Sequence, residues 1–361
     1  MKTTIGEVGS HFPTSISAMI PMAIKLRDPT EECWIFQNGN YNVLFLKDGS
    51  KVRFNDLDTL IPDHPDCVDL TISTYCKNNC PFCYMSCSDK GRMLDPTSPD
   101  LDKLLEEIPE GTELAVNCNS LDYNTMDLFT KFLRKVEETG KFFVNVTIHE
   151  DDFMAHYESL KWFQEIGYVH GIGVSISNRV PFSDPVAKDN QIRYMKELCS
   201  IINKMENIVL HIIPRLVNFD PVGKILIREL HSPKILMLGY KEMGRGLNLL
   251  TEKDLHNQNI RLAIWKDIVY KLYSQRFPTK LTISFDGLAL QEFGIRDMVS
   301  ENDFNTLYAG NEGAYSMYIN LPDRKYARSS IDGVEYDWGD KTFKEMFESI
   351  RTPALGEEGG R

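Results

Sequence analysis

The chain reads Cys67-Val-Asp-Leu-Thr-Ile-Ser-Thr-Tyr-Cys76-Lys-Asn-Asn-Cys80-Pro-Phe-Cys83-Tyr-Met-Ser-Cys87 where an alternating stretch runs directly into four cysteines. Apolar and polar residues alternate from 67 to 73, which predicts a β-strand. The cysteines then lie on the loop after that strand, and the first three have the spacing CX3CX2C. Three thiolates on one short loop can hold three irons of a [4Fe-4S] cube and leave the fourth iron open to a substrate or cofactor.

Strand and helix patterns alternate after this first strand. Apolar residues with helical spacing, as in Phe129, Phe132 and Leu133, separate short apolar stretches that are typical of strands. Strands that alternate with helices indicate a parallel α/β sheet, either open or curled into a barrel. The strands are predicted at 67–73, 113–117, 142–148, 170–176, 208–213 and 235–238, and the helices near 98–108, 128–136, 154–166, 185–204 and 258–275.

One face of several predicted strands is small or polar, while the other face is apolar. A sheet that is covered by helices on both faces should be apolar on both. The pattern therefore favours an incomplete, open-sided barrel whose outer face packs on helices and whose inner face lines a ligand-filled space. The inner-face residues are Asp69, Thr71, Ser73, Asn145, Thr147, His149, Gly171, Gly173, Ser175 and Ser177.

The chain divides into three predicted segments. Residues 1–65 hold a small β meander with strands near 34–36, 41–46 and 51–54, and Pro62-Asp-His-Pro65 marks its end. Residues 66–275 form the barrel. Residues 276–361 form an α/β extension that covers the barrel opening, with strands at 282–285 and 316–319 and a helix near 341–350.

The composition fits an ordinary globular protein, since 42% of the 361 residues are hydrophobic and 25% are charged. The net charge of −12 disfavours an extended nucleic-acid groove, because such binding needs many Lys and Arg contacts to phosphate. The apolar segment 16–24 is short and broken by Pro21, so we expect neither a signal peptide nor a membrane span. The eight cysteines are then expected to be reduced, metal-bound or buried, in a cytoplasmic protein.

Two other kinds of metal site compete for the cysteine loop. Structural zinc usually draws two CX2C-like pairs about a dozen residues apart, and the sequence has no second pair. A bacterial ferredoxin has the run CX2CX2CX3C followed by proline, whereas here the first gap is three and Ser88 follows Cys87. A non-enzymatic zinc-binding or iron–sulfur electron-transfer protein remains the alternative from another class.

The motif CX3CX-aromatic-C, with Phe82 before the third cysteine, resembles that of the radical S-adenosylmethionine (SAM) superfamily. The resemblance implies a partial (β/α)6 TIM-like barrel, a [4Fe-4S] cluster on Cys76, Cys80 and Cys83, and SAM on the fourth iron. It also implies reductive cleavage of SAM to a 5′-deoxyadenosyl radical that abstracts hydrogen from a substrate. The electron donor would be a protein such as flavodoxin or ferredoxin. A fourth thiolate would block the iron that SAM needs, so we interpret Cys87 as a bystander.

The Gly-Gly-Glu-like element that contacts the SAM amino group in this superfamily is missing from the chain. Asn117-Cys-Asn-Ser120 stands at the corresponding place, after the second strand. We expect three kinds of residue to contact SAM. Some stand where the missing element would be, one precedes the third cysteine, and the others face the barrel interior near strand ends. They are Phe82, Asn117, Asn119, Ser120, Thr147, Ser175 and Ser177.

Polar and cationic residues after other strands are candidate substrate contacts. Arg215, Lys241 and Arg245 follow strand ends and could hold a carboxylate or phosphate. The basic run 324–328 follows Tyr318 closely and could cover a substrate. The full set is His149, Arg215, Tyr240, Lys241, Arg245, Tyr318 and Arg328, and the catalytic residue stays unknown.

More narrowly, the layout resembles radical SAM proteins of phages and some bacteria, most of them of unassigned function. The matching features include His170-Gly-Ile-Gly-Val-Ser175, Gly239-Tyr-Lys and Gly244-Arg-Gly246. Some phage enzymes of this kind are linked to rearrangement of amino-acid-modified thymines in DNA. The resemblance implies a small-molecule, nucleoside or modified-base substrate, in the host cytoplasm if the protein is phage-encoded. Peptide modification is the alternative within the superfamily.

Overall fold

The computed structural model describes residues 2–4, 30, 32–55, 57, 59–177, 185–274, 281–301, 303–304 and 312–353. Predictions that concern other residues, such as the apolar segment 16–24, lie outside the described residues. Of the helices in the described part of the chain, none has the length and apolar character needed to cross a membrane.

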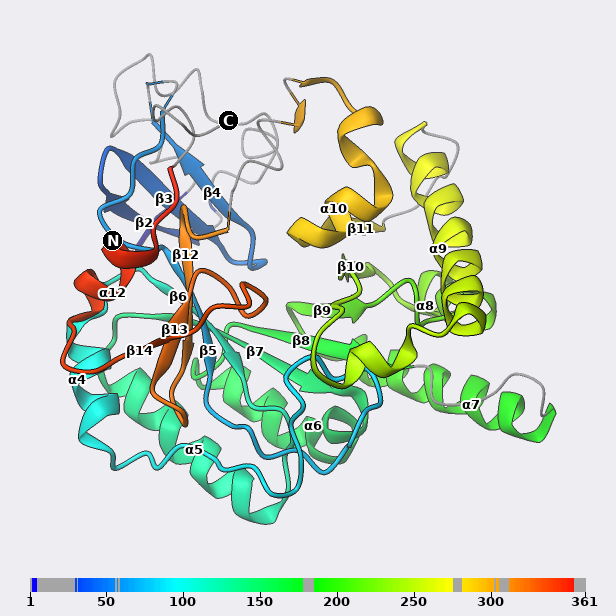
Figure 1. Ribbon diagram of the computed structural model, residues 1–361, viewed down its shortest axis with the longest axis horizontal. Helices are drawn as coiled ribbons and strands as arrows, with labels where there is room; N and C mark the ends of the chain where they lie inside the picture. The colour runs from blue at the N-terminus through cyan, green and yellow to red at the C-terminus, as the bar shows by residue number, and fades with distance from the viewer. Residues whose placement is uncertain are drawn as a thin grey trace.

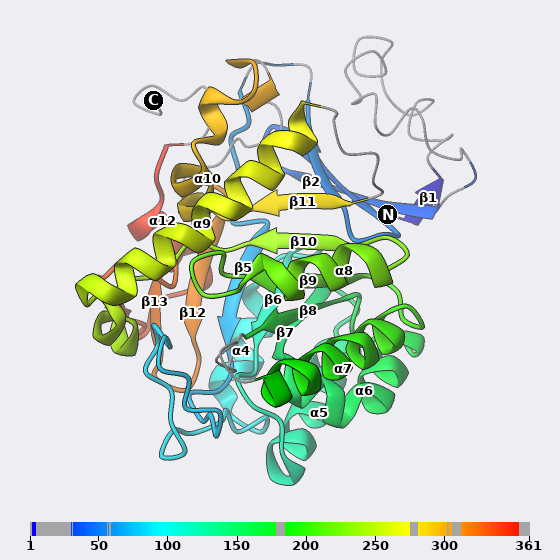
Figure 2. The same cartoon turned by 90° about the vertical axis from the view of Figure 1, so that its right-hand side faces the viewer.

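A ten-stranded sheet forms the body of the protein, with the strand order β11-β10-β9-β8-β7-β6-β5-β12-β13-β14 (Figures 1 and 2). Neighbouring strands from β5 to β11 are parallel, and β12 pairs in parallel with β5. The six predicted barrel strands are confirmed as β5 Cys67–Thr71, β6 Glu113–Asn117, β7 Phe143–His149, β8 Gly171–Ile176, β9 Ile208–Ile212 and β10 Lys234–Met237. The result is a partial (β/α)6 barrel with an α/β extension.

The C-terminal strands extend this sheet at both of its ends. β11 Thr282–Phe285 adds to β10, whereas β12 Ser316–Asn320 adds to β5 at the other end. β13 Lys325–Ala327 and β14 Tyr336–Asp337 follow β12 as antiparallel strands. Within the described residues β11 and β14 are the two edges of the sheet, which leaves the barrel open on that side.

Helices cover the outer, convex side of the strands (Figures 1 and 2). Side chains at alternate strand positions, such as Val68, Leu70 and Ile72 of the first strand, are fully buried in the core beneath these helices. Each side chain of this kind stabilises the fold by about 1.5–3 kcal/mol. The helices are α4 Pro99–Glu107, α5 Tyr123–Glu138, α6 Glu150–Glu165, α7 Pro185–Ile202, α8 Lys224–Glu229, α9 Glu252–Tyr273, α10 Gly287–Phe293 and α12 Phe343–Ile350.

The predicted β meander is a four-stranded antiparallel sheet that packs near the start of the barrel strands. The ring of Phe45 stacks on Phe143, the first residue of β7, with 4.0 Å between ring centroids. Because the cysteine loop follows the other end of β5, the meander and the loop lie at opposite ends of the barrel. The meander strands are β1 Lys2–Thr4, β2 Glu32–Asn38, β3 Tyr41–Leu46 and β4 Lys51–Phe54.

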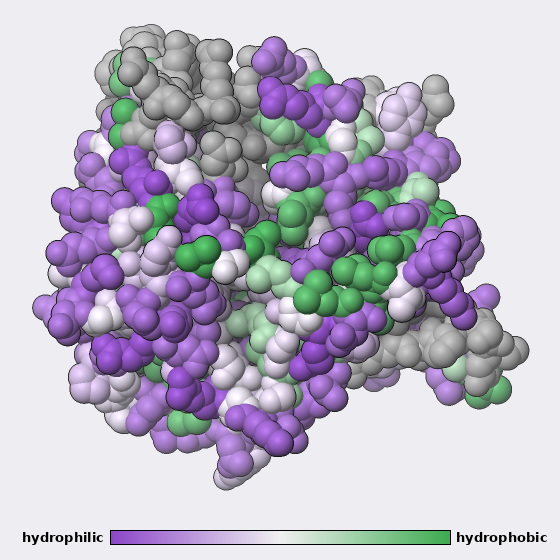
Figure 3. All heavy atoms as spheres, in the orientation of Figure 1, coloured by the Kyte–Doolittle hydropathy of each residue, from purple (hydrophilic) through white to green (hydrophobic). Residues whose placement is uncertain are grey.

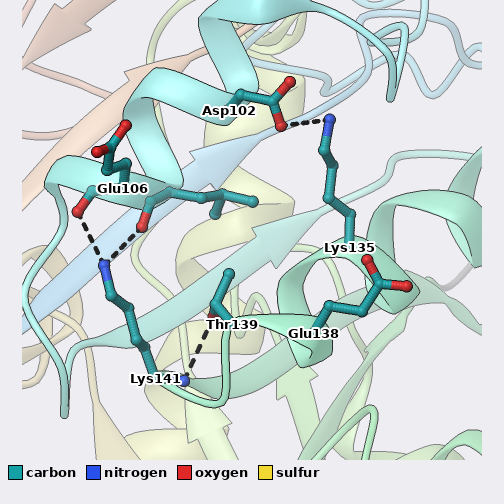
Figure 4. Close-up of a pocket in the computed structure, with 7 residues that line it drawn as sticks. Asp102, Glu106, Lys135, Glu138, Thr139 and Lys141 are labelled. Atoms are coloured by element: carbon teal, nitrogen blue, oxygen red, sulfur yellow. Dashed lines mark hydrogen bonds and ion pairs between the residues drawn. The ribbon is translucent and has the colours of Figure 1, made fainter.

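A pocket of about 390 Å³ opens on the surface between α4 and α5 (Figure 4). The ammonium group of Lys141 donates to the carbonyl oxygens of Leu105 and Glu106 at 2.9 and 2.8 Å, and Lys135 pairs with Asp102 at 2.5 Å. These contacts satisfy carbonyl groups at the end of α4 and tie it to α5. We therefore interpret this pocket as part of the packing between the two helices.

Candidate functional site

The cysteine loop leaves β5 and folds back along itself before α4. The amide of Thr74 donates to the carbonyl of Arg92 and the amide of Cys76 donates to the carbonyl of Ser88, both at 2.8 Å. A Cβ at Gly91 would lie 2.0 Å from the carbonyl oxygen of Thr74, so only glycine permits this close return. The base of the loop is therefore closed, with the four cysteines inside it.

Contacts from the loop to the next elements hold it over the carboxyl ends of the strands. The hydroxyl of Tyr75 donates to Asp122 at 2.8 Å, at the start of α5. The ammonium group of Lys77 donates to the carbonyl of Leu121 at 2.9 Å and pairs with buried Asp152 of α6 at 3.3 Å. This end of the barrel is where such folds place their ligands.

The four cysteines of the loop differ in burial and in their hydrogen bonds. Cys76 and Cys87 are buried, whereas Cys80 and Cys83 are half-buried. The Cys87 thiol donates to the sulfur of Cys83, which lowers the pKa of Cys83. Burial raises the pKa of Cys76. All eight cysteines lie within the described residues, and no disulfide bond joins any two of them.

Within the described residues, no group of three or more His, Cys, Asp or Glu side chains gathers to hold a single metal ion. In a [4Fe-4S] cube, however, each cysteine binds a different iron, so its ligands need not converge on one point. The donor set that the loop offers is thiol sulfur at CX3CX2C spacing, which is the ligand type that such clusters take.

Asn119 and Asn117 follow β6 and contact the cysteine loop. Asn119 has a left-handed backbone with φ of 60°. Its side-chain nitrogen Nδ2 donates to the carbonyl oxygen of Ser73 and, at 3.2 Å, to the sulfur of Cys87. The amide nitrogen of Asn117 lies 3.8 Å from the sulfur of Met85. The buried hydroxyl of neighbouring Ser120 has no hydrogen-bond partner among the described residues. The structure thus brings these three candidates beside the loop.

The ends of β7 and β8 carry a second polar group. A ring nitrogen of His149 lies 3.2 Å from the Ser177 hydroxyl, and both the amide and the hydroxyl of Ser177 donate to Glu150, at 2.8 and 2.7 Å. Ser175 pairs with His149 across the two strands, and Thr147 precedes it on the same face. Sequence reasoning missed buried Glu150, although a carboxylate directly after a strand end is a signal that could have found it.

A charged group lines the interior of the barrel. Tyr318 of β12 pairs with Asp69 of β5, so their side chains lie on the same inner face. The ammonium group of Lys241 lies 3.9 Å from the ring centroid of Tyr84 and 3.4 Å from the hydroxyl of Ser330. Burial lowers the pKa of Lys241 and raises that of Asp69, while their opposite charges partly offset both shifts. Asp69 was expected to face the interior but was not counted among the site residues.

His211 of β9 extends over the neighbouring strand at Gly173 of β8. A Cβ at Gly173 would lie 2.4 Å from the imidazole ring. Burial, helped by the charge of Lys241, lowers the pKa of His211 to about 4, so the ring is neutral at pH 7. The small inner face of β8 thus makes room for an imidazole, which sequence reasoning did not foresee.

We expect Gly173→Ala to destabilise the fold by about 1–3 kcal/mol, because the new methyl group would displace the His211 ring. Urea unfolding of the single and double variants measures this effect. In Gly173→Ala with His211→Ala the clash is absent, so the double variant should lose less stability than the two single variants summed. Strict additivity would contradict the packing argument.

The remaining candidates are spread over the barrel mouth and the helices outside it. Arg215 pairs with Glu292 of α10 at 2.6 Å, and Arg328 makes a two-point contact with Asp332 at 2.7 and 2.9 Å. The Tyr240 hydroxyl donates to the carbonyl of Gly246 at 2.6 Å. Phe82 and Arg245 belong to the cysteine loop and to the turn that packs on it. The structure therefore brings Tyr240, Lys241 and Arg245 to the loop and directs Arg215 and Arg328 to acidic partners.

Comparison with known proteins yields similarity in structure only. No family model matches the chain, and no curated protein matches it. Among solved structures, SuiB of Streptococcus suis bound to S-adenosylmethionine is similar, with a TM-score of 0.55 and 12% identity over 89% of each chain. SuiB bound to precursor peptide SuiA gives a TM-score of 0.54 and 14% identity over 82% of this chain and 67% of that one. The similarity shows a shared fold.

Proposed function

We propose that the protein is a radical SAM enzyme. The observation that carries the proposal is the CX3CX2C loop at the carboxyl end of the first strand of a partial barrel, in a fold shared with a protein that binds SAM. Fold alone does not fix function, so the cysteine loop is the decisive part. An electron donor such as flavodoxin or ferredoxin would be its partner.

In this proposal Cys76, Cys80 and Cys83 hold a [4Fe-4S] cluster, and Cys87 stays a thiol that donates to Cys83. When bound, the cluster supplies the electron that cleaves SAM to methionine and a 5′-deoxyadenosyl radical. Phe82, on the loop itself, would pack beside the cofactor. The polar contacts to SAM would come from Asn117, Asn119, Ser120, Thr147, Ser175 and Ser177, whose positions surround the loop and the neighbouring strand ends.

The substrate would lie in the barrel interior beside Asp69, Lys241 and Tyr318. It would lose a hydrogen atom from carbon to the radical, which becomes 5′-deoxyadenosine. Figure 3 shows apolar and weakly polar residues gathered near the middle of one face of the molecule, inside a hydrophilic rim. We infer a small-molecule, nucleoside or modified-base substrate, with His149 and Tyr240 as further contacts.

Anaerobic reconstitution tests the proposal directly. The full chain, incubated with iron and sulfide and then with SAM and dithionite, should show cluster absorbance and release 5′-deoxyadenosine, measured by liquid chromatography. The matched control omits dithionite and should give no product. A protein that takes up zinc instead, or that holds a cluster and never cleaves SAM, would contradict the proposal.

Peptide modification is the second candidate, favoured by the similarity to SuiB bound to a precursor peptide. The two candidates differ in where the substrate enters, because a peptide needs an extended surface beside the barrel interior. Incubating the reconstituted protein with deuterated nucleosides and with deuterated peptides distinguishes them. Deuterium transfer to 5′-deoxyadenosine identifies the class that is the substrate.

A further inference from the structure

The turn Gly244-Arg245-Gly246 packs directly against the backbone of the cysteine loop. A Cβ at Gly244, whose φ is 52°, would lie 2.3 Å from the carbonyl oxygen of Tyr84. A Cβ at Gly246 would lie 2.7 Å from the carbonyl oxygen of Lys241 and 3.5 Å from that of Phe82. A side chain at Gly244 would therefore push the turn away from the loop, and one at Gly246 would clash with the main chain of Lys241.

Arg245 contacts the main chain of three cysteines from this close position. Its backbone amide donates to the carbonyl of Cys83 at 3.0 Å. Its guanidinium donates from Nε to the carbonyl of Cys80 at 3.0 Å and from Nη1 to the carbonyl of Cys87 at 2.8 Å. The two bonds from the guanidinium are charge-assisted. They fix the distance between the main chains of Cys80 and Cys87, which are the two ends of the stretch 80–87.

The third guanidinium nitrogen of Arg245, Nη2, does not bind the cysteine loop. Nη2 is buried and has no hydrogen-bond partner among the residues that the structure describes. A buried donor without an acceptor is costly, and more so when it belongs to a charged group. The natural acceptor for a buried cationic nitrogen beside three cysteines is an anionic group held by those cysteines.

We propose that Arg245 is a positioning residue that clamps the cysteine loop and presents Nη2 to the anionic iron–sulfur group or to the SAM carboxylate bound there. The proposal rests on the proposed function. Reduction adds one negative charge to the cluster, so a fixed cation beside it favours the reduced form. Arg245 was predicted as a substrate contact, but two of its nitrogens already bind the loop.

The test compares Arg245→Gln and Arg245→Lys with the full wild-type chain after anaerobic reconstitution. Iron and sulfide contents report on the clamp, and the midpoint potential, followed by electron paramagnetic resonance, reports on the charge. We expect the equilibrium constant for one-electron reduction to fall about tenfold in Arg245→Gln, which is a shift of about 59 mV to more negative potential. Arg245→Lys keeps the positive charge but lacks the several N–H donors of the guanidinium. Its midpoint potential should therefore lie between those of the wild type and Arg245→Gln.

Arg261→Gln is the matched control. Arg261, on α9, also donates to neutral oxygens, but these belong to Asn218 and Arg215, at 2.9 and 3.2 Å, and not to cysteines of the loop. Its iron content and potential should match the wild type. If the wild type itself assembles no cluster, the proposed function fails. If the wild type has a cluster and Arg245→Gln has the same iron content and potential, the role of Arg245 alone is overturned.

Loss of iron in Arg245→Gln, with normal iron in Arg261→Gln, supports the clamp. In that case Arg245→Lys decides the electrostatic part, because it keeps a cation near the loop. A potential in Arg245→Lys that lies between the wild-type value and about 59 mV below it supports the electrostatic part, because this variant keeps the cation. A potential shifted by the full amount of about 59 mV despite the retained cation, together with unchanged SAM affinity by equilibrium dialysis, would overturn the assignment of Nη2 to a bound anion.

Discussion

Cys80→Ala is expected to abolish cluster assembly and 5′-deoxyadenosine formation, whereas Cys87→Ala should keep both. Cys80 is the middle cysteine of the CX3CX2C run, half-buried at the mouth of the loop. Without it only two thiolates of the run remain, and a cube held by two cysteines has two open irons that are readily lost. Cys87 is buried, donates to Cys83 and accepts from the side-chain nitrogen of Asn119.

The loss of Cys87 removes one hydrogen bond to a ligand but no proposed ligand. We therefore expect iron and sulfide contents near the wild-type level in Cys87→Ala and activity within about tenfold of it, a change of about 1.4 kcal/mol. The two variants are compared by iron analysis, absorbance near the cluster band and chromatography of the SAM products. A cluster that survives in Cys80→Ala but not in Cys87→Ala would exchange the two roles and contradict our assignment.

The arrangement of strands and helices could be predicted from the sequence because it depends on local periodicity. Alternation in 67–73 and 170–176 correctly separates core residues from those that face the barrel interior, since a strand has a fixed period of two. The cysteine spacing is likewise local. Which residues lie on the loop could therefore be predicted, although their chemical roles stay predictions.

The contacts that hold the loop in place could not be predicted. Arg245 meets Cys80 across 165 positions of the chain, and Lys77 meets Asp152 across the barrel mouth. Hydrogen bonds of this kind depend on where whole elements pack, which no local pattern encodes. The left-handed backbone of Asn119 is a further case, because its side chain and main chain are both fixed by the neighbouring loop.

The junction between the meander and the barrel shows the same limit, because a buried ion network joins them. Asp66, just before β5, accepts from two guanidinium nitrogens of Arg53, Nε and Nη2, at 2.6 and 2.7 Å and from the Tyr41 hydroxyl at 2.9 Å. Lys51 pairs with Asp66 at 3.1 Å and with Glu113 at 2.7 Å. The Asp66 side chain is 1% exposed, so its partners replace water entirely.

We expect Asp66→Asn to reduce the free energy of unfolding by roughly 3–5 kcal/mol, because it leaves two half-buried cations without the fully buried anion that they share. Burial alone would raise the pKa of Asp66, but Lys51 and Arg53 hold it well below its usual range. A lowered folded-state pKa stabilises the fold above the unfolded-state value of about 4 and loses this effect as the pH falls further. Wild-type stability should therefore drop below about pH 4.

Urea unfolding at pH 7 and at lower pH, followed by tryptophan fluorescence, measures both effects. Asp127→Asn is the matched control, because Asp127 pairs with Lys131 at 2.7 Å but both side chains are more than half exposed. Exposed pairs contribute little, so this variant should unfold like the wild type and keep its acid sensitivity. The stability of Asp66→Asn should fall less at low pH than that of the wild type, because the carboxylate that is protonated there is absent. Equal stability of the two variants at pH 7 would show that the buried network does not hold the meander to the barrel.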